Sequence, residues 1–144
     1  METRPTTLQW GRIFSAIFGG YFTSLFLLFC AVGGYGRLLS FLGRGPFSAA
    51  EVDAFTARNS AWAASLTLLI TAFVASAWAV LAVAPSAAQR HGVMIGLGIG
   101  VLSLLIEYFF GGLDLFDLLI TALAAGVGWI GALLGRRISG YRGG

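Results

Sequence analysis

The sequence predicts an all-α, polytopic membrane protein in which four transmembrane helices form two antiparallel hairpins. Hydrophobic residues make up 58% of the 144 residues and charged residues only 10%, whereas about a quarter of a soluble domain is charged. Four apolar runs approach or exceed the ~20 residues that a helix needs to cross a bilayer. The rest of the chain is too short for a soluble catalytic domain, so we expect one integral membrane domain over residues 1–144.

The apolar runs define the expected spans, which cover residues 13–32, 61–84, 93–112 and 115–135. Trp10 and Tyr35 flank the first run at the two levels where aromatic residues lie at membrane interfaces. The segment from Pro85 to Gly92 joins the second and third runs, and residues 111–114 join the third and fourth. Because such short connections place consecutive helices antiparallel, we expect each hairpin to be tightly closed.

The one sizeable polar segment, residues 33–60, is expected to be an extracytoplasmic loop. It contains Ser48 followed three residues later by Glu51, a capping-box pattern in which each side chain satisfies a free backbone donor. We expect a short helix near residues 49–58 that lies along the membrane surface. Two roles remain open for it, a solvated connector and a functional lid.

The distribution of arginine predicts the orientation of the chain. With four spans, six arginines lie on the side of the termini and three on the other: Arg4, Arg12, Arg90, Arg136, Arg137 and Arg142 against Arg37, Arg44 and Arg58. The positive-inside rule then places both termini in the cytoplasm. The absence of lysine and the abundance of alanine and glycine indicate GC-rich codons. We therefore expect the cytoplasmic (inner) membrane of a bacterium.

A carboxylate inside the third apolar run is the strongest functional signal. It lies on a helical face of small or polar residues, namely Gly96, Gly100, Ser103, Glu107 and Gly111. An ionisable side chain is costly in lipid and normally faces another helix or a water-filled cavity. Glu107 therefore points inward. Together with Asp114 and Asp117 it forms a candidate intramembrane proton or cation site.

A purely structural role for Glu107 is the alternative. Its carboxyl would then hydrogen-bond serine or threonine groups of the first two spans, or pair with Arg58 at the outer end of the second span. Small residues in the third and fourth spans predict close helix packing; they are Gly96, Gly100, Ser103, Gly128, Ala132 and Gly135.

Catalytic and metal-binding sets are missing from the sequence. Cys30 and His91 are the only residues of their types, so neither an intrachain disulfide nor a Cys/His metal cluster is expected. Cys30 and His91 are predicted to lie on opposite sides of the membrane, His91 in an interfacial loop, and no nucleophile with its base is visible. We therefore expect no cofactor, no metal, no nucleic-acid partner and no enzymatic activity.

Two stretches resemble known families. The run from Arg12 to Tyr21, RIFSAIFGGY, resembles the start of small bacterial inner-membrane proteins of unknown function that are linked to iron uptake, a similarity that extends over residues 11–84. This resemblance implies an accessory role beside siderophore or iron import. Residues 106–135, with Glu107, Asp117 and Thr121, look like the carboxyl-terminal half of VanZ-like membrane proteins.

Two function classes follow from these observations. The first is a non-enzymatic accessory or assembly protein whose small-residue faces bind another membrane protein or a second copy of the chain. The second is a small oligomeric transporter or channel that uses Glu107, Asp114 and Asp117 as a proton or cation route. In both classes the lipid bilayer is the protein's immediate environment.

Overall fold

The computed structural model describes residues 7–39, 41–42 and 48–141. They form four long helices, α1 (Trp10–Leu39), α2 (Ala49–Ala79), α3 (Pro85–Phe110) and α4 (Leu115–Tyr141), and a short 3-10 helix, η2 (Val80–Ala82), that follows α2. These elements are all helical, and α1 to α4 are each long and apolar enough to cross a membrane. The prediction of an all-α, multi-pass membrane protein is therefore confirmed.

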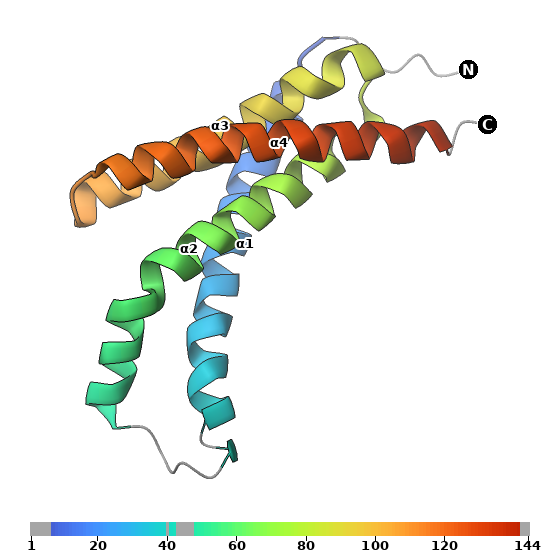
Figure 1. The fold of residues 1–144 in the computed structure, drawn as a ribbon. Coiled ribbons are helices and arrows are strands. Elements are labelled where there is room, and N and C mark those ends of the chain that lie inside the picture. The colour runs from blue at the N-terminus through green and yellow to red at the C-terminus, as the bar shows by residue number, and fades with distance from the viewer. Residues whose placement is uncertain (1–6, 40, 43–47, 142–144) are drawn as a thin grey trace.

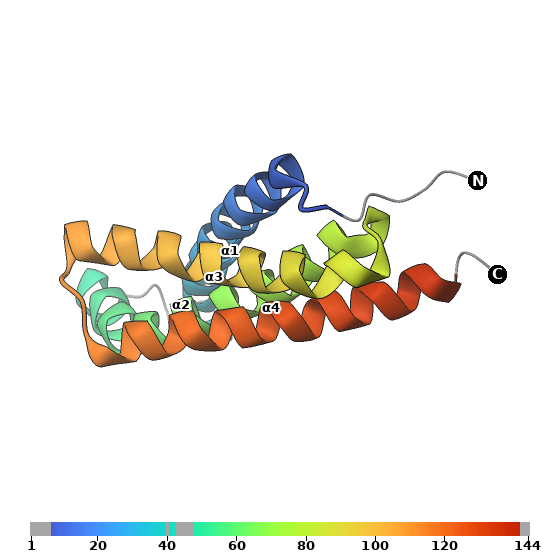
Figure 2. The same cartoon turned by 90° about the horizontal axis from the view of Figure 1, so that it is seen from above.

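The helices form two antiparallel hairpins, α1–α2 and α3–α4. The hairpins cross at a steep angle, so that the start of α2 and the turn between α3 and α4 point apart (Figure 1). Seen from above, α3 and α4 run side by side, and α1 crosses on the far side of α3 from α4 (Figure 2). Within the described residues α1 contacts α2 and α3 but not α4.

The backbones of α3 and α4 meet through glycines. A Cβ atom on Gly96 would collide with the carbonyl oxygen of Ala124, and one on Gly128 would collide with the carbonyl oxygen of Gly92. Because these positions have no side chain, the two helices approach until backbone touches backbone. Further along α4, Gly135 makes the same kind of contact with the carbonyl oxygen of Ala77 in α2.

Hydrogen bonds between helices accompany this packing. Three hydroxyl groups reach a neighbouring helix over 3.2 to 3.3 Å: Ser24 to Thr67 (α1 to α2), Ser76 to the Gly92 carbonyl (α2 to α3) and Thr121 to the Gly100 carbonyl (α4 to α3). Within a bilayer each bond of this type contributes on the order of 1 kcal/mol. All four helices are thus tied into one bundle.

Two expected boundaries are corrected. The expected surface helix near residues 49–58 is the first part of α2, which runs on to Ala79 because no helix breaker follows the capping box of Ser48 and Glu51. The segment from Pro85 to Gly92 was expected to be a connection between spans and instead forms the first two turns of α3. Proline is favoured at the first position of a helix, because an N–H there would have no partner within the helix and because the φ angle of proline is already close to the helical value. The chain therefore starts the next helix directly after the second span.

His91 is also placed differently from the prediction. It was expected in an interfacial loop, but it lies in the second turn of α3 and is fully buried. The early start of α3 at Pro85 is the reason, because it draws the whole connecting segment into the helix.

The glycine contacts predict that Gly96→Ala destabilises the bundle. The added methyl group would force α3 away from Ala124, and such overpacking costs about 1 to 3 kcal/mol. Gly19→Ala is the matched control, because nothing lies within 4 Å of the Cβ position there. Reversible unfolding in mixed micelles measures both variants. Equal stabilities for the two variants would contradict the close contact between α3 and α4.

The capping box predicts a titration at the start of α2. The Ser48 backbone N–H and hydroxyl both donate to the Glu51 carboxylate, each over 2.9 Å, and lower the pKa of Glu51 below its usual 4.5. These bonds stabilise the helix start above pH 4.5 and are lost as the pH falls through the lowered pKa. The NMR shift of the Ser48 amide should report a midpoint below 4.5. Ser48→Ala should raise that midpoint; an unchanged midpoint would refute the assignment.

Candidate functional site

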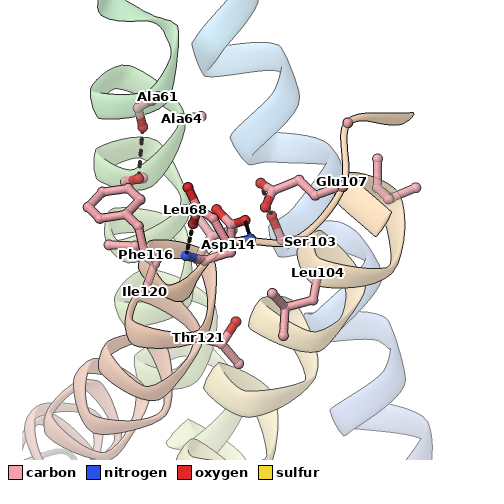
Figure 3. A pocket seen from close by; sticks show the side chains of 15 residues that line it. Ala61, Ala64, Leu68, Ser103, Leu104, Glu107, Asp114, Phe116, Ile120 and Thr121 are labelled. Carbon is pink, nitrogen blue, oxygen red and sulfur yellow. Dashed lines mark hydrogen bonds between the residues drawn. The ribbon is translucent and has the colours of Figure 1, made fainter. Parts of the chain in front are cut away.

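A cavity of about 450 Å³ lies between α2, α3 and α4, near the turn that joins α3 to α4. Glu107 points into this space from α3, while Asp114 and Thr121 approach from the start of α4 (Figure 3). We call it the acidic cavity; its polar lining consists of Ser65, Ser103, Glu107, Asp114, Asp117 and Thr121. It is the place where the ends of the two hairpins diverge.

The turn after α3 fixes the position of Glu107. The Glu107 carbonyl accepts hydrogen bonds from the N–H groups of Gly111, over 2.7 Å, and Gly112, over 2.9 Å. Gly112 has a φ of +85°, a left-handed backbone conformation that glycine adopts readily because it has no Cβ atom. The two glycines therefore end α3 one turn beyond Glu107 and return the chain directly into α4.

Two aspartates at the start of α4 cap the helix by reciprocal bonds. The Asp114 N–H donates to Oδ2 of Asp117, and the Asp117 N–H donates to Oδ1 of Asp114, both over 2.9 Å. Negative charge is also favoured here because the first turn of a helix carries the positive end of its dipole. The capping arrangement explains why two carboxylates are held rigidly at this edge of the cavity.

The carboxyl groups of the acidic cavity lie close together. The Glu107 carboxyl accepts from the Ser103 hydroxyl over 3.3 Å and interacts electrostatically with both Asp117 and Asp114. Neighbouring carboxylates repel each other unless a proton or a cation lies between them. The arrangement is therefore chemically suited to hold one positive charge.

The wall opposite Glu107 comes from α2. Ser65 lines the cavity, and its hydroxyl donates to the Ala61 carbonyl of its own helix over 2.8 Å. Beside it, Trp62 meets Phe116 of α4 edge to face, with ring centres 5.9 Å apart. This aromatic contact joins α2 to the beginning of α4, and Phe116 also lines the cavity.

Tyr21 of α1 is a neighbour of the site that sequence reasoning missed. It is only 7% exposed and is close enough to Glu107 for an electrostatic interaction. Within the described part of the chain its hydroxyl makes no hydrogen bond. The sequence signal for this residue was a polar tyrosine inside an apolar run, directly after Gly20. In the structure Gly20 lies where α1 touches Ile99 of α3.

The structure gathers some of the residues singled out from the sequence and separates others. Glu107, Asp114 and Asp117 meet in the acidic cavity. Arg58 is exposed on α2, and no ion pair joins it to Glu107 among the described residues. The remaining small residues lie where helices touch: Gly96, Gly100, Gly128, Ala132 and Gly135.

Comparison with known proteins assigns no role to the acidic cavity. No protein-family model, curated protein or solved structure matches this chain. Within residues 7–39, 41–42 and 48–141, no three His, Cys, Asp or Glu side chains are grouped closely enough to hold a metal ion. What the cavity does offer is a carboxyl pair with hydroxyl groups around it.

The geometry predicts that the acidic cavity contains water. In a Cys30→Ala background, Ser65→Cys should react rapidly with a charged, water-soluble thiol reagent, because a thiol must ionise to react. Ser76→Cys, fully buried, and Val74→Cys, exposed on the apolar outer face, are the controls and should be inert. A Ser65→Cys thiol as inert as these two would show that the cavity is dry.

Proposed function

We propose that the protein is a small transporter or channel in which Glu107 binds a proton or small cation during passage through the membrane. The carboxyl pair of Glu107 and Asp117 in the acidic cavity is the observation that carries this proposal. A proton suits the pair best, since it can bridge two carboxyl oxygens without further ligands. Hydroxyl groups at Ser65, Ser103 and Thr121 add oxygen atoms that can orient water in the cavity.

The placement of the acidic cavity supports a route toward one membrane face. Asp114 and Gly112 are exposed at the α3–α4 turn, whereas Glu107 is half-buried one to two turns further in. The arginine distribution supports an orientation in which the turn end faces outward from a bacterial inner membrane and both termini lie in the cytoplasm. On this proposal Asp114 and Asp117 attract a cation from outside and Glu107 receives it.

An accessory or assembly role is the second candidate, favoured by a different surface. A groove of about 210 Å³ between α1 and α2 is lined by Ser15, Gly19 and Thr23 on one side and by Val74 and Trp78 on the other. Small residues on an outward face allow a partner helix to approach closely. The resemblance to proteins linked to iron uptake would place such a partner in siderophore or iron import, and the role would be non-enzymatic.

The transport proposal predicts a selective defect in Glu107→Gln. This variant keeps the shape of the side chain and one accepting oxygen but cannot carry the charge or bind a proton, so proton or cation flux into proteoliposomes should be lost or become independent of pH. Glu51→Gln is the control and should leave flux unchanged, because Glu51 lies outside the cavity.

Stability and oligomeric state are measured on the same samples. Unchanged flux in Glu107→Gln would reject the transport proposal. Lowered stability or a lost oligomer without any flux defect would assign Glu107 a structural role and favour the accessory candidate.

A further inference from the structure

His91 connects α3 to the segment that precedes α1. Its imidazole is fully buried, and each ring nitrogen has a hydrogen-bond partner 2.9 Å away. Nε2 faces the backbone N–H of Gln9, and Nδ1 faces the carbonyl oxygen of Ala87 one turn earlier in α3. The ring therefore joins the start of one helix to the side of another.

These partners define the protonation state of His91. A backbone N–H can only donate, so Nε2 must be an unprotonated acceptor. A carbonyl oxygen can only accept, so Nδ1 carries the hydrogen. The structure thus holds the neutral Nδ1–H tautomer, and a proton added to Nε2 would place two donors face to face.

Gln9 is the residue immediately before α1. Its carbonyl accepts the first helical hydrogen bond, from the N–H of Ile13 over 3.0 Å. Its side-chain oxygen, Oε1, is buried and has no hydrogen-bond partner, the one such atom found among the described residues. An unpaired buried acceptor is costly. Gln9 therefore has a backbone donor that binds the imidazole and a buried side-chain acceptor without a partner.

We propose that His91 and Gln9 form a proton-operated latch that holds the start of α1 against α3. In the neutral state the Gln9 N–H donates to Nε2. In the protonated state Nε2–H donates instead to Oε1 of Gln9, so the Gln9 side chain stays attached while its backbone N–H loses its partner and the first turn of α1 opens to water. Only one proton is taken up in this exchange, and the unpaired Oε1 provides the acceptor that the second state needs.

The charges around the latch favour opening on protonation. The charged groups toward this end are Arg12 on α1, Arg90 on α3, and Arg136 and Arg137 on α4, whereas the described acidic residues belong to the opposite ends of the hairpins. No described carboxylate is therefore available to neutralise a buried imidazolium. Because a buried charge without a partner is strongly disfavoured, protonation should be coupled to an opening that admits water.

The two sides of the latch differ in how firmly they are held. Beside His91, Gly92 packs directly on the backbone of α4 at Gly128, so the ring sits on the rigid α3–α4 hairpin. On the other side, α1 has no contact with α4 within the described residues. Opening should therefore move the beginning of α1, with Leu8 leaving the core cluster against which it packs. The latch does not depend on the acidic cavity.

Hydrogen–deuterium exchange in lipid nanodiscs tests this proposal. Peptides covering residues 7–16 are followed between about pH 8 and about pH 5, the range in which an unperturbed histidine changes its charge. After correction for intrinsic exchange, protection of this segment should fall by about tenfold or more on acidification, as expected for the loss of one hydrogen bond. His91→Gln should remove this response, because glutamine can accept from the Gln9 N–H but does not titrate.

Gln9→Met removes Oε1 while retaining the backbone N–H. Because the protonated imidazole then has no side-chain acceptor on Gln9, the loss of protection should require a lower pH. Gln89→Met, the same substitution at an exposed position of α3, is the control and should behave like the unchanged protein. The proposal is overturned if protection of residues 7–16 does not depend on pH, or if the response persists in His91→Gln. An identical midpoint in Gln9→Met and Gln89→Met would remove Oε1 from the mechanism.

Discussion

The direct backbone contact between α3 and α4 is the constraint on which the rest of the structure depends. Gly96 against Ala124 and Gly92 against Gly128 set the register of this hairpin. Lipid provides no hydrophobic force between helices, so close van der Waals contact must supply much of their attraction. With the register set, Glu107 necessarily faces the beginning of α4 and its capping aspartates. The position of the carboxyl groups at one end of the molecule is thus a consequence of the glycine contacts along its middle.

The crossing of the two hairpins creates the acidic cavity. Where α2 packs on α4 through Gly135 and Ala77 the helices touch, but at the other end the start of α2 and the α3–α4 turn point apart. Glu107 and Asp117 line the space between α2 and this turn together with apolar side chains such as Leu68. Polar groups at this depth are costly unless they are paired or hydrated, so their concentration here agrees with a site built for a charge.

Apolar run length sufficed to predict the fold, because the bilayer sets the length of a spanning helix regardless of tertiary contacts. The gathering of Glu107 and Asp117 was also predictable from helical spacing and a short turn. Four features were not predictable from the sequence. The continuity of α2 and the early start of α3 at Pro85 depend on an absence of breakers and on proline's preference for a first turn. The approach of Tyr21 and the burial of His91 depend on how the hairpins cross, and helical periodicity within one segment carries no information on that crossing.

On the transport proposal, Glu107 and Asp117 share a positive charge inside the membrane. Infrared spectroscopy of the protein in lipid, recorded through a pH titration, measures whether this pair binds a proton. We expect the carbonyl stretch of a protonated carboxyl group that is sensitive to deuterium exchange and is lost in both Glu107→Gln and Asp117→Asn. If neither substitution removes a carboxyl band, in a sample also free of bound metal cations, the pair holds no positive charge and the proposal is wrong.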